Sequence, residues 1–385
     1  MRRETTLLVL TTLALSALGA LMVYSVDAAR PGGGGYFAQH CAYLGIGLAL
    51  FLFFFHMDYH LLGNERVFRY VVIIAVILLV LVLVPGIGTK VGGARRWIRV
   101  FGRGFQPSEF AKFALVLLLA VKLTQNQAKM QRFWRGIAVP FLMAGFFAGL
   151  VALEKDIGIP LVMMVMAYVM VFIAGGRLLY LGGMAGVGAA ALTVMILVAP
   201  HRVARIIAFW DPWAQREGDG WQLIQSLSAF AQGGLWGRGA GAGEQKLGYL
   251  PAAHTDFIFA TVGEEFGLFG TLSVLLLIVL FTWAALRVAA NARDLFGTLL
   301  ASGVCTLISF QAAFIIAVTL GLLPTKGLPL PLVSYGGSAL MATLAMAGML
   351  ANIGSQAEEE RRPRPERGRA PVGVFRRRRA AHSAP

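Results

Sequence analysis

Ten apolar stretches of roughly bilayer length dominate this sequence. They cover residues 6–26, 37–57, 68–86, 108–124, 137–153, 158–175, 180–199, 261–286, 297–321 and 333–353. A helix of about 20 apolar residues crosses the hydrocarbon core of a membrane. Charged residues make up 14% of the chain, against about 25% in soluble domains, which is too few to give a protein of this size a solvated surface. The sequence therefore predicts an all-α integral membrane protein with about ten transmembrane helices.

The number of stretches and the positions of positive charge predict the topology. An even number of spans leaves both termini on one side, and Lys and Arg residues near the membrane concentrate on the cytoplasmic side. We therefore expect a polytopic membrane domain at residues 1–354 and a disordered, basic cytoplasmic tail at residues 355–385. Basic segments beside a membrane attract anionic membrane lipids, so the net charge of +15 does not require a nucleic-acid partner.

Two predicted outer loops also carry positive charge. The segment 87–107 holds Lys90, Arg95, Arg96, Arg99 and Arg103, and the large extracytoplasmic loop at about 200–257, between helices 7 and 8, holds Arg202, Arg205, Arg216, Arg238 and Lys246. Positive charge on the translocated side opposes insertion. Two interpretations stay open: these are tolerated loop charges, or they form an anion-binding surface on the outer face.

Ionisable residues at membrane depth are costly, so each one is a candidate functional residue. Glu109 and Lys112 lie three residues apart at the start of the fourth stretch, on one face of the expected helix, where they can pair. Such a pair is either part of a site or a purely structural ion pair, and the sequence leaves both open.

The densest group of ionisable residues lies where the long outer loop meets the eighth stretch. Asp256 stands at the water boundary, where partial burial can shift the pKa of a carboxylate. His254 lies two residues before it, and Glu264 and Glu265 lie further along the expected helix. Their spacing matches no closed metal site, so the identity of any metal ligand stays unknown.

The last outer loop, residues 321–338, combines prolines at positions 324, 329 and 331 with paired glycines at 336 and 337. This composition predicts an irregular backbone at membrane depth. Such a backbone is tolerated only where protein covers it or where it lines a wet cavity. We therefore expect an outward-facing cavity that contains acids, bases and aromatic residues.

Four motifs resemble the signatures of the SEDS proteins (shape, elongation, division and sporulation). They are GGARRWI at 92–98, FQPSEFAK at 105–112, HTDFIFA at 254–260 and PLVSYGGS at 331–338. The likeness spans residues 5–355 or so and includes the order of the motifs and the number of spans. Residues 323–327, LPTKG, are similar to FtsW, the division branch, more than to RodA, the elongation branch.

The resemblance implies a peptidoglycan glycosyltransferase that polymerises lipid II and releases undecaprenyl diphosphate on the outer face of the cytoplasmic (inner) membrane. It also implies a place at the division septum, a class B penicillin-binding protein and other division proteins as partners, and no organic cofactor. The family's essential acid matches Asp256, and other sensitive positions match Trp97, Glu109 and Lys112. A flippase or transporter of lipid-linked precursor and a non-catalytic division scaffold are the alternatives.

The chemistry of lipid II suggests roles for these residues. Diphosphate is a good leaving group, so one carboxylate, Asp256, can suffice as the general base that activates the acceptor hydroxyl. Cations would stabilise the charge of the departing diphosphate, and a divalent cation, Mg²⁺ or Mn²⁺, could share that task. The candidate substrate-binding residues are Arg95, Arg96, Trp97, Glu109, Lys112, His254, Thr255, Lys326, Ser334 and Tyr335.

Three positions depart from the usual pattern of the family. Residues 155–159 read KDIGI where PDLGT is frequent, Ile315 replaces a frequent Asn, and Gly104, with Arg103 beside it, replaces a frequent basic residue. The roles of Asp156, Ile315 and Arg103 are therefore left open.

Overall fold

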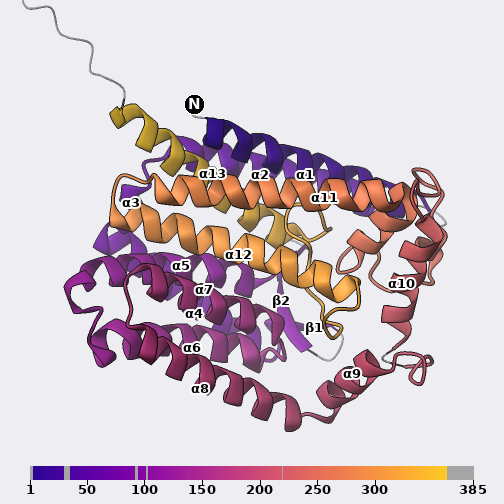
Figure 1. Cartoon of the computed structure of the whole chain (residues 1–385), viewed down its shortest axis with the longest axis horizontal. Coiled ribbons are helices and arrows are strands. Elements are labelled where there is room, and N and C mark those ends of the chain that lie inside the picture. Colours follow the sequence, from indigo (N-terminus) through magenta and orange to yellow (C-terminus); the bar gives the residue numbers. More distant parts are fainter. Residues whose placement is uncertain (1–2, 30–34, 92–93, 101–102, 219, 362–385) are drawn as a thin grey trace, which may run out of the picture.

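The computed structural model describes residues 3–29, 35–91, 94–100, 103–218 and 220–361. Long helices run side by side through the molecule, and a small sheet and two shorter helices gather at one end of them (Figure 1). The long helices are α1 (Arg3–Ala28), α2 (Tyr36–His56), α4 (Glu65–Leu83), α5 (Pro107–Gln125), α6 (Val139–Leu153), α7 (Gly158–Ile173), α8 (Leu178–Leu197), α11 (Ile258–Ala290), α12 (Leu295–Thr319) and α13 (Gly337–Arg361).

Shorter elements connect these helices. They are α3 (His60–Gly63), α9 (Pro200–Trp210), α10 (Trp221–Gly233), the 3₁₀ turns η1 (Gln127–Lys129) and η3 (Gln245–Leu247), and η2 (Phe133–Ala138), a π-helical turn that leads into α6. The strands β1 (Gly88–Val91), β2 (Ala94–Val100) and β3 (Arg103–Phe105) form an antiparallel sheet in that order. The first two glycines of the first motif, at 92 and 93, lie outside the described residues.

The ten apolar stretches all become helices. Among the described residues, eight helical segments are long and apolar enough to cross a membrane: α1, α2, α4, η2 with α6, α8, α11, α12 and α13. The other two stretches are α7, which is shorter at 16 residues, and α5, which carries Glu109, Lys112 and Lys122. The predicted membrane protein with about ten spanning helices is confirmed, and its apolar outer surface makes it a multi-pass membrane protein.

Small residues let the central helices approach closely. Gly348 of α13 lies against the backbone of Phe51 in α2, where an added Cβ atom would come within 2.3 Å of the Phe51 carbonyl oxygen. At Gly19 of α1, an added Cβ atom would come within 2.5 Å of the carbonyl oxygen of Val333, in the loop before α13. Such contacts are typical of membrane helices, which gain stability from close packing. The contact at Gly19 places the loop before α13 against α1, inside the bundle.

The long loop between α8 and α11 is partly helical and is anchored by the two acids of α11. The Glu264 carboxylate accepts hydrogen bonds from the backbone amides of Glu244 (2.7 Å) and Gln245 (3.2 Å). The Glu265 carboxylate forms an ion pair with Lys246 at 2.5 Å and accepts a hydrogen bond from Ser25. Both carboxylates therefore hold the loop in place, and neither joins His254 and Asp256 as the sequence had suggested.

The helix α13 continues further than the sequence predicted. It runs to Arg361, so the first seven residues assigned to the disordered tail are helical. Gln356, Ala357 and Glu358 are strong helix formers, which extends α13 past the membrane. The remainder of the predicted tail, residues 362–385, lies outside the described residues.

Removing the cation that neutralises Glu265 should destabilise the protein. The side chains of Lys246 and Glu265 are 1% and 0% exposed, so Lys246→Met leaves a buried charge without its partner. We expect a loss of about 3–5 kcal/mol, measured as a lower thermal midpoint in lipid nanodiscs. The double variant K246M/E265Q removes the isolated charge and should recover most of the loss. A single variant as stable as the wild type would contradict this assignment.

Candidate active site

A polar cavity of about 640 Å³ lies at the end of the bundle that carries the sheet. Six segments meet around it: the start of α2, strand β2, the segment from β3 to the start of α5, the start of α7, the segment before α11 and the loop that leads into α13. Its polar lining residues include Gln39, Tyr43, Arg96, Trp97, Gln106, Asp156, Thr255, Asp256 and Tyr335. The cavity thus brings together five of the predicted site residues, which are Arg96, Trp97, Thr255, Asp256 and Tyr335.

A β-bulge directs Arg96 and Trp97 into the polar cavity. Trp97 is opposite Thr89 and Arg95 is opposite Lys90, so Arg96 is the extra residue of β2. An extra residue in one strand re-aims the side chains around it. Arg95 does not line the polar cavity. It lines a smaller pocket with Lys90 and Lys155, so the sequence grouped two arginines that the structure separates.

Arg96 is held in the wall of the polar cavity by the turn between α6 and α7. Its guanidinium donates to the carbonyl oxygens of Glu154 (3.3 Å) and Lys155 (2.7 Å) and forms an ion pair with Asp156 at 3.3 Å. Asp156 in turn accepts a hydrogen bond from the amide of Gly158 at 2.8 Å, at the start of α7. Asp156, whose role the sequence left open, therefore fixes the cation that faces the cavity.

Asp256 is the carboxylate of the polar cavity that has no hydrogen-bond or ion-pair partner among the described residues. It immediately precedes Phe257 and α11, and its side chain makes no hydrogen bond or ion pair with any residue that the structure describes. Gly327 lies so close that an added Cβ atom would come within 2.8 Å of an Asp256 oxygen. Burial, together with the negative charge of Asp156, raises the pKa of Asp256 to about 7, while Arg96 and Arg205 oppose the rise. The group can therefore accept a proton near neutral pH.

Hydrogen bonds join the segment before α11 to the loop before α13. The Ser334 hydroxyl donates to the carbonyl oxygen of Thr255 (2.6 Å) and accepts from the amide of Leu330 (2.8 Å). The amide of Tyr335 donates to the carbonyl oxygen of His254 at 2.9 Å. Ser334 thus holds the two segments together and is not among the residues that line the cavity. The same bonds fix the backbone that carries Asp256.

Aromatic rings form the rim of the polar cavity next to these bonds. The His254 ring lies 4.8 Å from the ring of Tyr36 and 5.7 Å from that of Tyr335, centre to centre. The Tyr335 hydroxyl donates to the side-chain oxygen of Gln39 at 2.8 Å. Aromatic faces and amide groups at a cavity rim are suited to contact sugar rings. Gln39 and Tyr43 were missed by sequence reasoning, and the available signal was polar side chains inside an apolar stretch.

Glu109 and Lys112 are paired, as the spacing predicted, but they do not line the cavity. Both are buried in α5, with the Lys112 nitrogen 2.8 Å from the Glu109 carboxylate. Lys112 also donates to the side-chain oxygen of Gln311, and the Gln311 amide donates to the carbonyl oxygen of Pro329, which does line the cavity. The pair is therefore linked through Gln311 to the loop before α13, and this loop lines part of the cavity.

Lys326 lies beside Gly327, half-buried next to the polar cavity. Burial, together with the charges of Arg205, Arg96 and Arg202, lowers the pKa of Lys326 to about 8, while Asp156 opposes the shift. Lys326 is therefore part of the same electrostatic environment as Arg96, although it is not among the residues that line the cavity. A phosphate group in the cavity would raise the pKa of Lys326 again and would be bound more tightly for it.

Backbone strain is concentrated in the segments that frame the polar cavity. Among the described residues, three that are not glycine have positive φ: Lys155 (61°), Ala252 (57°) and Leu332 (66°). They lie in the turn before α7, the segment before α11 and the loop before α13. A left-handed conformation at such residues costs about 1–3 kcal/mol and persists only where neighbouring contacts impose it. Strain of this kind is typical of functional sites.

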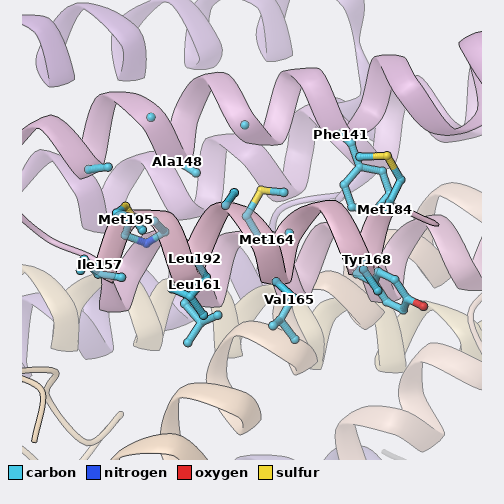
Figure 2. Close-up of a pocket in the computed structure, with 18 residues that line it drawn as sticks. Phe141, Ala148, Ile157, Leu161, Met164, Val165, Tyr168, Met184, Leu192 and Met195 are labelled. Carbon is cyan, nitrogen blue, oxygen red and sulfur yellow. The ribbon is translucent and has the colours of Figure 1, made fainter. Parts of the chain in front are cut away.

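An apolar cavity of about 630 Å³ lies beside the polar one, between α6, α7 and α8. Figure 2 shows its side chains, among them Ile157, Leu161 and Met195, between these helices. Ile157 directly follows Asp156, so consecutive residues at the start of α7 line the apolar and the polar cavity. Sequence reasoning missed this cavity, because its walls are ordinary apolar residues of three predicted spans.

Comparison with known proteins identifies the family. A family model described as cell cycle protein, covering FtsW, RodA and SpoVE, matches residues 5–359. The chain belongs to this family. A probable peptidoglycan glycosyltransferase FtsW from Geobacter sp. strain M18 is 39% identical over 352 residues, which are 89% of this chain and 94% of the relative. Stage V sporulation protein E of Bacillus subtilis strain 168 is 38% identical over 353 residues, with 90% and 96% covered.

Solved structures of the FtsW/RodA/SpoVE family share the fold. A chain from a peptidoglycan synthase complex, whose structure concerns the coordination of polymerization and crosslinking, matches with a TM-score of 0.76 and 31% identity, over 91% of this chain and 97% of that one. The rod shape determining protein RodA of Thermus thermophilus matches with a TM-score of 0.67 and 28% identity, over 91% and 96%. The family and the closer likeness to FtsW, which the motifs indicated, are confirmed.

Glu154 of this family member is a buried carboxylate at the turn that holds Arg96. Its side chain is 1% exposed, and neither carboxylate oxygen has a hydrogen-bond partner among the described residues. Burial and the charge of Asp156 raise the pKa of Glu154 from 4.5 to about 8, against the effect of Arg96. Glu154 is therefore mostly protonated at neutral pH.

Glu154→Gln should make the protein more stable at alkaline pH. The stability that the protonated acid contributes is fully present below pH 4.5 and is lost as the pH rises through about 8, because the unfolded chain releases its proton first. The neutral Gln variant avoids this loss, so its thermal midpoint should exceed that of the wild type by an amount that grows from pH 5 to pH 8. Parallel midpoint curves for the two proteins over that range would contradict the assignment.

Proposed function

We propose that this chain is a peptidoglycan glycosyltransferase that polymerises lipid II, with the polar cavity as its active site. The names of its FtsW relatives and the synthase complex that shares its fold support this proposal. The observation that carries it is Asp256, a carboxylate without a partner among the described residues and with a pKa of about 7, in a cavity that also contains Arg96. The adjoining apolar cavity fits a substrate with a polar head and a polyprenyl chain.

The cavity residues can carry out the transfer without a second carboxylic acid. The acceptor hydroxyl oxygen attacks the anomeric carbon of the donor while Asp256 accepts the hydroxyl proton. The bond from that carbon to the diphosphate oxygen breaks, and undecaprenyl diphosphate leaves with both bonding electrons. Arg96 and Lys326 stabilise the charge on the leaving group. Attack from the face opposite the diphosphate inverts the configuration of the anomeric carbon.

We further propose that a divalent cation, Mg²⁺ or Mn²⁺, would be held by the Asp156 carboxylate together with the substrate diphosphate, while Asp256 stays free to accept a proton. Mg²⁺ commonly binds one or two carboxylates, keeps several waters and takes its other ligands from substrate phosphates. The carboxylate of Asp156, which faces the polar cavity, fits this requirement. The cation would neutralise charge on the diphosphate.

The orientation and the partners extend the proposal. With both termini in the cytoplasm, as the positive-inside rule favours, the sheet and the polar cavity face the outside of the membrane, where lipid II is polymerised. A class B penicillin-binding protein is the proposed partner, because the related complex couples polymerization with crosslinking. The similarity to FtsW favours the division septum and contact with other division proteins. Relatives named as glycosyltransferases favour an enzyme over a flippase or a scaffold.

Asp256→Asn should abolish polymerisation without unfolding the protein. Removal of a general base lowers rates by about 10²- to 10⁴-fold. The measurement is glycan polymerisation from labelled lipid II by the purified chain with its cognate penicillin-binding protein. Since the base acts when deprotonated, the wild-type rate should fall below pH 7 and reach a plateau above it. The control is a thermal midpoint no lower than that of the wild type, and normal turnover by the variant would refute the role of Asp256.

Metal dependence can be tested separately. A chelator should lower wild-type polymerisation at least about tenfold, and added Mg²⁺ or Mn²⁺ should restore it. Asp156→Asn should raise the Mg²⁺ concentration that gives half-maximal activity, because the charged protein ligand becomes neutral. Full activity in the presence of chelator would exclude the cation and leave Arg96 and Lys326 as the cations of the site.

A further inference from the structure

A second, basic pocket lies next to the polar cavity on the outer side of the molecule. It has a volume of about 260 Å³, and Leu83, Lys90, Arg95, Leu153 and Lys155 line it. We call these five residues the basic pocket. One turn separates it from the polar cavity, since Arg96 binds the carbonyl oxygen of Lys155 while the Lys155 side chain lines the basic pocket. The proposed reaction uses none of its three cations.

The basic pocket has more positive charge than its surroundings require. No carboxylate of a described residue forms an ion pair with Lys90, Arg95 or Lys155. The helices α4 and α6 end at Leu83 and Leu153, and each helix end contributes about half a negative charge. Arg95 makes one long hydrogen bond, 3.5 Å, to the carbonyl oxygen of Leu83. The three cationic side chains and the two helix ends together leave a net charge of about +2. This charge matches that of a phosphate or diphosphate group.

The depth of the basic pocket suits a lipid head group. Leu83 and Leu153 are the last residues of two membrane-spanning helices, so the pocket lies where the apolar core of the membrane ends. Leu153 is 67% exposed, and Lys90 and Lys155 are exposed as well. Cations at this level attract the phosphates of anionic lipids. A lipid can therefore reach the pocket sideways from the outer leaflet.

The position of Lys155 depends on the wall of the polar cavity. Its backbone has a φ of 61°, which an L-residue adopts only under constraint. The constraint comes from Arg96, which binds the carbonyl oxygens of Glu154 and Lys155, and from Asp156, which is fixed to the start of α7. The lysine is thus presented by a rigid turn, and binding of an anion does not have to order its backbone.

We propose that the basic pocket binds the phosphate or diphosphate group of a lipid in the outer leaflet, separately from the polar cavity. Two sources share this chemistry: an anionic phospholipid such as phosphatidylglycerol, and a polyprenyl diphosphate. If the polyprenyl diphosphate is preferred, the pocket holds the second lipid-linked molecule of the polymerisation, an identification that rests on the proposed function. The binding itself does not depend on that function.

The test measures lipid binding by the full-length chain in detergent, using native mass spectrometry with phosphatidylglycerol, undecaprenyl diphosphate and, as a lipid without net charge, phosphatidylcholine. The variant is Lys90→Gln/Lys155→Gln, which keeps Arg95 and its contact with the end of α4. The matched control is Arg99→Gln/Arg216→Gln, which removes the same charge from exposed positions in the outer segments 87–107 and 200–257. The expected loss for the pocket variant is roughly 10- to 30-fold in affinity for the anionic lipids.

The outcomes separate the two sources. A loss for both anionic lipids, with phosphatidylcholine unaffected, supports a general site for lipid phosphate, and a loss confined to one lipid identifies its ligand. Equal affinities in the pocket and control variants would overturn the proposal. Binding is measured again in the Asp256→Asn protein, which should bind like the wild type although it does not polymerise. A failure of the proposed reaction and a failure of the basic pocket are therefore distinguishable.

Discussion

The hydrogen bonds that join the segments before α11 and α13 hold the polar cavity in shape. Ser334 connects the amide of Leu330 with the carbonyl of Thr255, and the amide of Tyr335 reaches the carbonyl of His254. An irregular backbone inside a membrane protein is stable only where neighbouring protein or water satisfies its polar groups. Each of the two segments satisfies the other, so neither could adopt its conformation alone. Asp256 follows Thr255 directly, and its position is a consequence of this pairing.

The buried charges of the protein divide into those with a partner and those without. Lys246 neutralises Glu265, and Lys112 neutralises Glu109; these pairs fix a loop and a helix, and each removes the cost of a lone buried charge. Asp256 has no such partner among the described residues. A carboxylate that the fold leaves without a cation keeps its affinity for a proton, and this is the property that a general base requires near neutral pH.

The sequence predicted the helices well and the contents of the site less well, for a physical reason. Apolar length is a local property, so all ten stretches could be identified without knowledge of their neighbours. Site membership depends on contacts between distant segments. The adjacent residues Arg95 and Arg96 were grouped from the sequence, but the β-bulge places Arg95 in another pocket. Glu264 was also grouped with Asp256, although the Glu264 carboxylate binds backbone amides of the long loop. Asp256 was found because its motif and its place at a membrane boundary both pointed to it.

The turn between α6 and α7 shows how one short segment can serve three different environments. Lys155 faces the basic pocket, Asp156 the polar cavity and Ile157 the apolar cavity. A strand would present alternate residues to only two faces, so three consecutive residues with three environments need an irregular backbone. The left-handed conformation of Lys155 provides it. Proline cannot adopt a positive φ, so the lysine at this position permits the path that the turn takes. The proposed lipid-phosphate site outside the cavity and Arg96 inside it are therefore connected through a single, rigid piece of chain.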